Sequence, residues 1–365
     1  MTARLCVVLP GDVADPSAPS GGNVYGLRVC QELAAAHGWD VRRADLDGTW
    51  PRPGPAARAR LTGTLAALPD GATVLVDGLV AGGVPKIMEP AARRLRLAVL
   101  VHLPLADETG LEPALAAELA TREQATLRAA HAVVVTSPAA ARALRGRGLP
   151  AERIHVAAPG VDPAPLAAGT DGAHGLLCVA SLTPRKGQDL LLDALAELAD
   201  RPWTLVCAGP LHRAPTYVEA LRATLDRHGL TERVLLAGPL GGAALQARYD
   251  AADLAVLVSW TETYGMVVTE ALARGIPVLA TRAGALPDTL GHAPDGSRPG
   301  LLVPPGDATE LVAALRRWFD DATLRYRLRT AAHARRVILP GWEQTARSVH
   351  QVLDRLRRTP LEPPC

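Results

Sequence analysis

The chain has 365 residues, more than the roughly 250–300 at which a single hydrophobic core stops growing, so two domains are expected. Its hydrophobic fraction of 48% and charged fraction of 21% are those of a globular protein and argue against disorder. A net charge of +2 and an aromatic content of 3% provide neither a basic excess nor many stacking platforms, so no nucleic-acid partner is expected.

The five cysteines form no CxxC pair and lack the spacing of zinc ligands, so they are expected to be small buried hydrophobic residues. The apolar run 5–9 is too short for the core of a signal peptide. No apolar stretch has the ~18 residues needed to span a bilayer. We therefore expect a cytoplasmic protein, with peripheral contact to a membrane left open.

Apolar runs alternate with segments of helical periodicity along most of the chain, which predicts parallel sheets with crossover helices. In the first half, the polar loop 12–22 precedes a helical pattern that ends at Gly38, a residue suited to a C-cap. The Pro- and Arg-rich segment 51–60 is expected to be a surface excursion. The expected strands of this half are 5–9, 73–76, 97–101, 132–136 and 154–157.

The segment 159–175 is rich in Pro, Gly and Ala and has no periodicity, so it is expected to link two domains. The alternating pattern then restarts, and two last helices, 324–337 and 342–356, follow without a strand. Strands are expected at 176–182, 204–208, 234–237, 254–258 and 278–280, and helices at 189–198, 217–227, 243–252, 267–273 and 309–319. The predicted fold is α/β, with doubly wound parallel sheets in two Rossmann-like domains. Their predicted bounds are 1–165 and 166–338, followed by a C-terminal segment, 339–365.

The most informative segment is 259–281, which reads SWTETYGMVVTEALARGIPVLAT. Glu262 falls in a loop at the carboxyl end of a predicted strand, the edge where ligands of open parallel sheets bind. A carboxylate there can accept both hydrogen bonds of a vicinal diol, such as that of ribose or a hexose. Glu270 falls in the first turns of the next helix, where the alternative explanation is the ordinary preference of acidic residues for a helix N-terminus.

This segment resembles the E-x7-E signature of the family 4 retaining glycosyltransferases, whose usual form is close to S-x-x-E-G-F-G-x-x-x-x-E-A-x-A-x-G-x-P-V. The resemblance implies the GT-B fold, in which two Rossmann-like domains face a central cleft and the second binds a nucleotide sugar. It also implies that Glu262 contacts the donor sugar and that Glu270 binds the ribose hydroxyls. Thr263 stands where glycine is usual, which matters if the backbone there takes a positive φ. The other donor-binding positions implied for this segment are Thr263, Tyr264, Gly265 and Met266.

A second likeness is CVASLTPRKG, residues 178–187, which resembles the family loop that supplies an Arg and a Lys to the donor diphosphate. Lys186 fits the lysine position. Ser181, a further donor-binding position, stands where the family has its arginine, and Arg185 is predicted to compensate. Lys186 is one of two lysines among the 39 basic residues, which favours a specific role over the alternative, an ordinary surface charge.

In the first domain, Gly21 and Gly22 resemble the family's glycine loop, which faces the diphosphate and the acceptor. The pair is not a GxGxxG fingerprint, which argues against a dinucleotide dehydrogenase. His102 interrupts the apolar run 97–105 at a place where the family often has a histidine near the donor sugar. A structural histidine at a strand end is the alternative. Glu108 follows in a loop and could orient an acceptor hydroxyl.

The likeness covers nearly the whole chain and is weakest in 40–95, where acceptor specificity usually resides. PGVD at 159–162, GALPD at 284–288 and GLLVPPGD at 300–307 resemble turns and a strand of the family. The stretch WEQTA from Trp342 is similar to the helix that in this fold crosses back to the first domain.

The resemblance implies a retaining glycosyltransferase that moves a sugar from a UDP- or GDP-sugar to an acceptor hydroxyl, with a soluble small molecule as the favoured acceptor. The catalytic residues implied are Lys186, Arg185, His102 and Glu262. The two cations would stabilise the leaving diphosphate, so no cofactor and no metal are expected. The alternatives are a nucleotide-sugar epimerase, against which the E-x7-E segment argues, and a non-catalytic nucleotide-sugar-binding protein.

Overall fold

The computed structural model describes residues 3–17, 19–108, 110–170 and 173–361. Contacts within the chain divide it into two compact units. Unit 1 consists of Met1–Asp15, Gly21–Gly160 and Trp342–Cys365, and unit 2 of Pro16–Ser20 and Val161–Gly341. The stretch that begins at Trp342 therefore belongs with the N-terminal half of the sequence.

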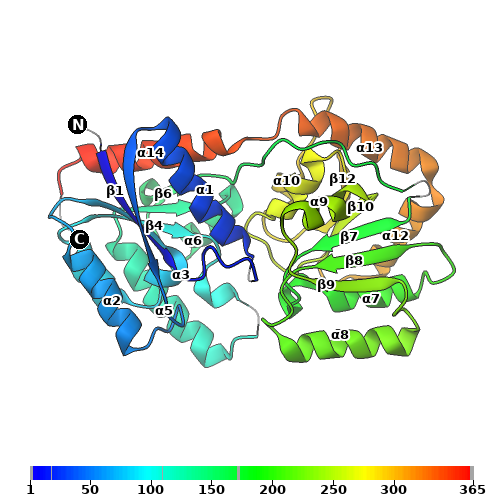
Figure 1. The fold of residues 1–365 in the computed structure, drawn as a ribbon, viewed down its shortest axis with the longest axis horizontal. Coiled ribbons are helices and arrows are strands. Elements are labelled where there is room, and N and C mark those ends of the chain that lie inside the picture. Colours follow the sequence, from blue (N-terminus) through cyan, green and yellow to red (C-terminus); the bar gives the residue numbers. More distant parts are fainter. Residues whose placement is uncertain (1–2, 18, 109, 171–172, 362–365) are drawn as a thin grey trace. The chain divides into compact units, whose positions relative to one another are not determined.

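Unit 1 is built on a six-stranded parallel sheet in the order β2-β1-β3-β4-β5-β6 (Figure 1). Its strands are β1 Ala3–Pro10, β2 Trp39–Leu46, β3 Thr73–Asp77, β4 Arg96–Val101, β5 Ala132–Val135 and β6 Ile154–Val156. Its helices are α1 Gly21–Ala36, α2 Pro55–Ala66, α3 Gly78–Ala81, α4 Pro85–Ala92, η1 Leu105–Asp107, α5 Pro113–Ala129, α6 Pro138–Gly146, η2 Ala151–Arg153 and α14 Trp342–Arg358. Helix α14 packs against α1 and also contacts β3, β4 and β5.

Two elements of unit 1 differ from the sequence prediction. The segment 51–60 was expected to be a surface excursion, and this is wrong from Pro55, where α2 begins with its proline at the first helical position. Helix α2 buries Ala57, Leu61 and Leu65, so its arginines face outward and hide the helical pattern. Strand β2 was not predicted, because half of its residues, WDVRRADL, are charged and it lies at the edge of the sheet.

Unit 2 contains a second six-stranded parallel sheet, in the order β12-β11-β10-β7-β8-β9 (Figure 1). Its strands are β7 Gly175–Val179, β8 Thr204–Ala208, β9 Val234–Gly238, β10 Leu254–Leu257, β11 Val278–Thr281 and β12 Gly300–Val303. Its helices are η3 Pro184–Lys186, α7 Gln188–Ala196, α8 Pro215–His228, α9 Gly242–Asp250, α10 Met266–Ala273, α11 Leu286–Leu290, α12 Ala308–Asp320 and α13 Ala322–Arg336. The predicted class, α/β with two Rossmann-like parallel sheets, is confirmed.

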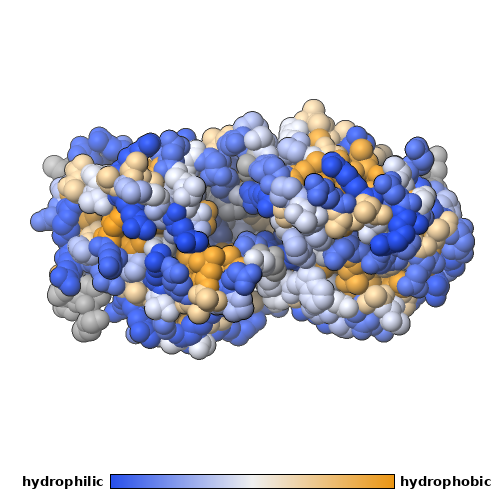
Figure 2. Space-filling view, turned by 90° about the horizontal axis from the view of Figure 1, so that it is seen from below, coloured by the Kyte–Doolittle hydropathy of each residue, from blue (hydrophilic) through white to orange (hydrophobic). Residues whose placement is uncertain are grey.

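Each sheet has its own hydrophobic core. Four cysteines, Cys6, Cys30, Cys178 and Cys207, are buried and carry free thiols, as predicted, and Cys365 lies outside the described residues. Among the residues that the structure describes, no helix has both the length and the apolar character needed to cross a membrane. On the face drawn in Figure 2, apolar residues form separate patches among polar ones.

The strand order places one switch point in each sheet, where crossover connections leave in opposite directions. In unit 2 it lies between β7 and β10, and in unit 1 between β1 and β3. Ligands of open α/β sheets bind beyond the carboxyl ends of the strands at such points. The loops that follow these strands are therefore the first place to look for a functional site.

Candidate active site

At the switch point of unit 2, the loops after β7 and β10 come together. Gly187 follows η3 in the left-handed region, with φ +68°, and a Cβ there would lie 2.5 Å from the Val258 carbonyl oxygen. Only glycine permits this approach. The Lys-Gly step recognised in the sequence therefore has a structural reason, because Gly187 lets the loop that carries Lys186 pack against the end of β10.

Four side chains form what we call the Glu262 cluster, namely Arg185, Lys186, Ser259 and Glu262. The Lys186 ammonium binds Glu262 Oε1, and Ser259 Oγ donates to the same oxygen at 3.0 Å. Arg185 Nη1 lies 3.8 Å from Glu262 Oε2. Lys186 and Glu262 are both largely buried, with side chains 15% and 8% exposed.

The charges of this cluster keep its carboxylate ionised. Burial raises the pKa of Glu262, but the charges of Lys186 and Arg185, with hydrogen bonds from Lys186 and Ser259, outweigh it, so the pKa lies below its ordinary value. Two cations and one anion then share a partly desolvated space. Such a site can hold a phosphate with its excess positive charge and a sugar hydroxyl with its carboxylate.

Contacts from two neighbouring loops, those after β7 and β11, fix the backbone around Glu262. Arg185 Nη1 donates to the Thr261 carbonyl at 3.1 Å, and the Trp260 amide donates to the Arg185 carbonyl at 2.8 Å. From the loop after β11, the Ala285 amide donates to the Glu262 carbonyl at 2.9 Å. The carboxylate is thus held before any ligand arrives, which limits reorganisation on binding.

Helix α10 begins at the same edge of the sheet. Its N-cap is Gly265, with φ +84°, where a Cβ would lie 2.6 Å from a methyl carbon of Leu286. Ala173 is the one non-glycine residue with a positive φ in the described part of the chain, so Thr263 has an ordinary backbone. The departure from the family glycine at Thr263 therefore brings no strain. The amides of Gly265 and Met266 stand at the helix N-terminus, where anions bind.

Glu270 lies one turn further along α10. Its Oε2 accepts a hydrogen bond from the Tyr249 hydroxyl at 2.7 Å, and its carbonyl accepts one from Arg274 at 2.8 Å. Burial raises the pKa of Glu270; the Tyr249 hydrogen bond and the Arg274 charge oppose this, but the pKa stays above its ordinary value. Tyr249 therefore orients a half-buried carboxylate.

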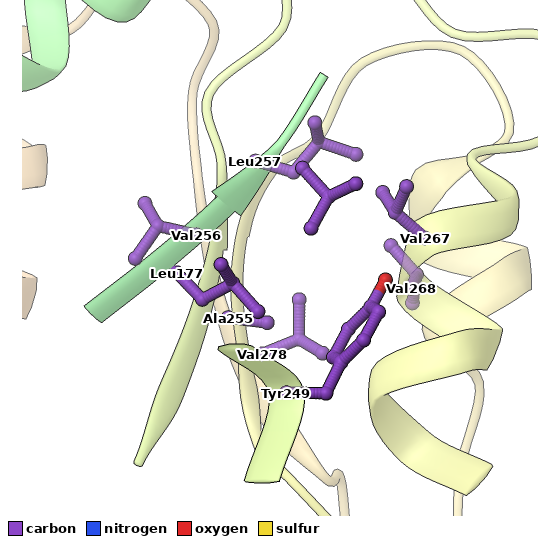
Figure 3. Close-up of a pocket in the computed structure, with 9 residues that line it drawn as sticks. Leu177, Tyr249, Ala255, Val256, Leu257, Val267, Val268 and Val278 are labelled. Carbon is purple, nitrogen blue, oxygen red and sulfur yellow. The ribbon is translucent and has the colours of Figure 1, made fainter. Parts of the chain in front are cut away.

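The space beneath α10 is not itself a ligand site. Figure 3 shows the Tyr249 ring among apolar side chains of the sheet and of α10. The gap that these side chains surround has a volume of only about 10 Å³. A gap of that volume holds at most one water. The gap is therefore too small for a nucleotide or a sugar.

Unit 1 has a second group of side chains, the His102 cluster, formed by Gly22, Tyr25, Asp77 and His102. Asp77 ends β3 and is 5% exposed; its Oδ1 accepts from the Leu79 amide at 2.7 Å, and its Oδ2 lies 3.2 Å from His102 Nε2. A Cβ on Gly22 would lie 3.1 Å from the His102 ring, and the buried Tyr25 ring meets that ring edge-on at 5.3 Å. Histidine and carboxylate together can hold or move a proton.

The remaining predicted residues lie in loops and at helix ends. Gly21 begins α1, so its amide stands at a helix N-terminus. Ser181 follows β7, and its carbonyl accepts from Gln188 at 3.1 Å. The Tyr264 carbonyl accepts a hydrogen bond from the Thr289 hydroxyl at 2.6 Å. Glu108 is exposed in the loop after η1. Among the described residues, no group of three or more His, Cys, Asp or Glu side chains could hold a metal ion.

Sequence reasoning missed four residues that contact the predicted ones. Tyr25, which packs against His102, falls in a helical pattern and gave no signal of its own. Asp77 was visible as the acidic end of the run TVLVD, but a lone acid after a strand is common. Ser259 opens the E-x7-E segment, but a serine after a strand does not by itself indicate a role. Tyr249 lies on another helix, α9, so only the fold brings its hydroxyl to Glu270.

Two Rossmann-like units of this kind define the GT-B class, and solved structures of that class match the chain over nearly its full length. Sucrose-phosphate synthase from Thermosynechococcus elongatus has a TM-score of 0.77 at 22% identity, covering 97% of this chain and 99% of that one. HepE from Anabaena, in complex with UDP-glucose, has a TM-score of 0.75 at 19% identity, covering 96% and 99%. These likenesses establish the fold.

Sequence comparisons establish the family. Residues 51–165 match the profile described as Glycosyltransferase Family 4, and residues 173–321 match that described as Glycosyl transferases group 1. A D-inositol 3-phosphate glycosyltransferase from Kineococcus radiotolerans is 33% identical over 257 residues, which are 64% of this chain and 59% of the relative. One from Jonesia denitrificans is 32% identical over 228 residues, 56% and 52% of the two chains. The chain thus spans between half and two thirds of the length of these curated relatives. It belongs to glycosyltransferase family 4, as the sequence motifs predicted.

Proposed function

We propose that this chain is a retaining glycosyltransferase that moves a sugar from a nucleotide diphosphate sugar to a hydroxyl of a small polyol. The observation that carries the proposal is the Glu262 cluster, in which an ionised carboxylate and two cations lie at the switch point of unit 2. The solved HepE complex with UDP-glucose supports a UDP-sugar as donor, and a GDP-sugar is the alternative. The family match leaves the epimerase alternative without support.

The donor's groups are matched to residues by their chemistry. Lys186 and Arg185 bind the diphosphate, with the amides that open α10 as further donors. Glu262 accepts hydrogen bonds from hydroxyls of the donor sugar, and Glu270 accepts those of the ribose diol. Both cations also lie beside the Glu262 carboxylate, and these contacts hold all three groups in place.

In the transfer step, the bond between the anomeric carbon and the diphosphate oxygen breaks, and its electron pair stays with the diphosphate. Lys186 and Arg185 stabilise the charge that develops there, so the step calls for no metal ion. The acceptor oxygen attacks from the same face, and its proton passes to the departing phosphate. Neither cluster then needs to supply a base or a covalent nucleophile.

Unit 1 is proposed to bind the acceptor. His102, whose Nε2 lies 3.2 Å from Asp77 Oδ2, is proposed to contact the sugar being transferred, and Glu108 an acceptor hydroxyl. The relatives named D-inositol 3-phosphate glycosyltransferase support a small, hydroxyl-rich acceptor. The proposal places the reaction in the cytoplasm.

The test uses radiolabelled UDP- and GDP-sugars with a panel of cyclitols and their phosphates. We expect acceptor-dependent release of nucleotide and an α-linked product from an α-linked donor, read from the coupling constant of the anomeric proton. Lys186→Met should abolish turnover, whereas Lys86→Met, which changes the chain's other lysine on exposed α4 surface, should not. Nucleotide binding without release from any donor would instead indicate a binding protein. A β-linked product would make the His102 and Asp77 pair a general base and refute the retaining mechanism.

A further inference from the structure

The loop that follows β4 carries both His102 and Glu108, and η1 lies in its middle. Side chains from two neighbouring helices, α5 and α6, contact this loop. Glu123 on α5 contacts Leu105 of the loop, and Arg147, at the end of α6, contacts Asp107 of the loop. We call these two contacts the loop clamp.

Glu123 makes the direct contact. It is 3% exposed, and both of its carboxylate oxygens lie 3.2 Å from the Leu105 amide nitrogen, which donates to them. Arg147 Nη2 donates to Asp107 Oδ1 at 2.5 Å. Gln124, the next residue on α5, donates to the Arg147 carbonyl at 2.7 Å, so α5 also holds the second contact in place.

A carboxylate at this position costs the fold stability. Burial raises the pKa of Glu123 to about 7, while the Leu105 amide and the Arg147 charge lower it and the Asp107 charge raises it. A carboxyl with a higher pKa in the folded than in the unfolded protein destabilises the fold once the pH exceeds its unfolded pKa, and protonation returns that stability. An uncharged residue would serve the packing of α5 better, which points to a use for the charge.

Solvent can reach the carboxylate. A cavity of about 300 Å³ lies between α5 and the end of α6, and its polar lining includes Thr121, Glu123, Gln124 and Arg147. Water in that space can exchange a proton with Glu123 without unfolding of the helix. The charged groups that act on Glu123 are Asp107 from η1 and Arg147 from α6.

We propose that Glu123 is a positioning residue whose ionised carboxylate holds the loop 102–108 in the arrangement that presents His102 and Glu108, and that its protonation loosens this loop. The roles of His102 and Glu108 in this inference rest on the proposed function, whereas the loop clamp rests on the contacts of Glu123 and Arg147 alone. An ionised carboxylate is the stronger acceptor for the Leu105 amide. The loop is therefore held firmly at a pH above about 7 and less firmly below it.

The test compares Glu123→Gln with Glu118→Gln, a matched control on the same helix whose side chain is 43% exposed and pairs with Arg122. Hydrogen exchange of the Leu105 amide, corrected for the intrinsic rate at each pH, reports the clamp. At pH 8, exchange should be roughly tenfold faster in Glu123→Gln, the loss expected for a hydrogen bond to a charged group. The wild type should approach that rate at pH 6, and the control should follow the wild type at both.

Two further measurements separate positioning from structure. Glu123→Gln should be at least as stable as the wild type to urea at pH 8, because it removes a costly charge. Its kcat/KM for the acceptor should lose the inflection near pH 7 and stay at the wild type's acid-side level, while the KM for the donor is unchanged. Unaltered Leu105 exchange, or an inflection that persists, would overturn the proposal. A wild type without transferase activity would refute the proposed function alone, because the exchange measurement would still decide the clamp.

Discussion

Replacing Lys186 by Met tests the electrostatics of the Glu262 cluster directly. The substitution keeps the volume but leaves a carboxylate that is 8% exposed without its nearest cation. Breaking a buried ion pair from one side costs ~3–5 kcal/mol. Arg185 at 3.8 Å and the Ser259 hydroxyl at 3.0 Å remain, so we expect the free energy of unfolding to fall by about 2–3 kcal/mol at pH 7.

The dependence of this loss on pH has a definite sign. In the wild type the pKa of Glu262 is lowered, so its ionised form contributes stability that is present above the unfolded pKa and lost as the pH falls through the folded pKa. In Lys186→Met, burial dominates and the pKa of Glu262 rises. As the pH falls, protonation of Glu262 removes the unpaired charge from the variant. The difference in free energy of unfolding between the two proteins should therefore become smaller toward about pH 5.

The assay is urea unfolding at several pH values for the wild type, Lys186→Met, Glu262→Gln and the double variant, with Lys86→Met as the control. Lys186→Met takes the nearest cation from Glu262, and Glu262→Gln takes the carboxylate from Lys186, whereas the double variant removes both members of this ion pair. The loss in the double variant should therefore be smaller than the sum of the two single losses by ~1–3 kcal/mol. Additive losses, or a difference that is constant with pH, would refute the reasoning.

Three further changes test other contacts. Glu270→Gln should raise the Kd for nucleotide roughly tenfold, since the hydrogen bonds to ribose lose their charge; calorimetry that finds no change would remove this residue from the donor site. Asp77→Asn keeps an acceptor for the α3 cap but removes the charge beside His102. The kcat should therefore fall, while the free energy of unfolding changes by less than ~1 kcal/mol. A rise in the KM for the donor without a fall in kcat would count against a role of Asp77 in orienting the imidazole. Gly284→Ala places a Cβ 2.0 Å from the Glu262 carbonyl oxygen and should cost ~1–3 kcal/mol in urea unfolding. Gly63→Ala, at an exposed position inside α2 with open space around it, should cause no loss.

The sequence allowed most of the fold to be predicted because its strands are short apolar runs between helices of regular period. The exceptions have a common physical cause. Strand β2 and helix α2 carry arginines on their exposed sides, so a polar surface concealed an element that the tertiary structure stabilises. Buried parallel strands such as β3 and β5, by contrast, are apolar on both faces and were readily recognised.

For the site, the motifs located Lys186, Glu262 and Glu270 because their spacing within single segments is informative. Pairings between segments could not be read in this way. That Lys186 contacts Glu262, that Tyr249 binds Glu270, and that Asp77 lies beside His102 all depend on which strands are neighbours in the sheet. Strand order is set by packing over the whole domain and has no local signature.

The return of α14 to unit 1 has a consequence for how the protein is made. Unit 2 is, in effect, an insertion into unit 1, between Gly160 and Trp342. Trp342, Ala346, Val349 and Leu353 are buried on α14, and Thr345 donates to the Ala158 carbonyl at 2.8 Å. During synthesis these groups leave the ribosome only after unit 2 is complete. Multidomain chains usually fold their N-terminal domain first. Here unit 2 can complete its folding first, because unit 1 cannot bury the face that packs against α14 until that helix has been synthesised.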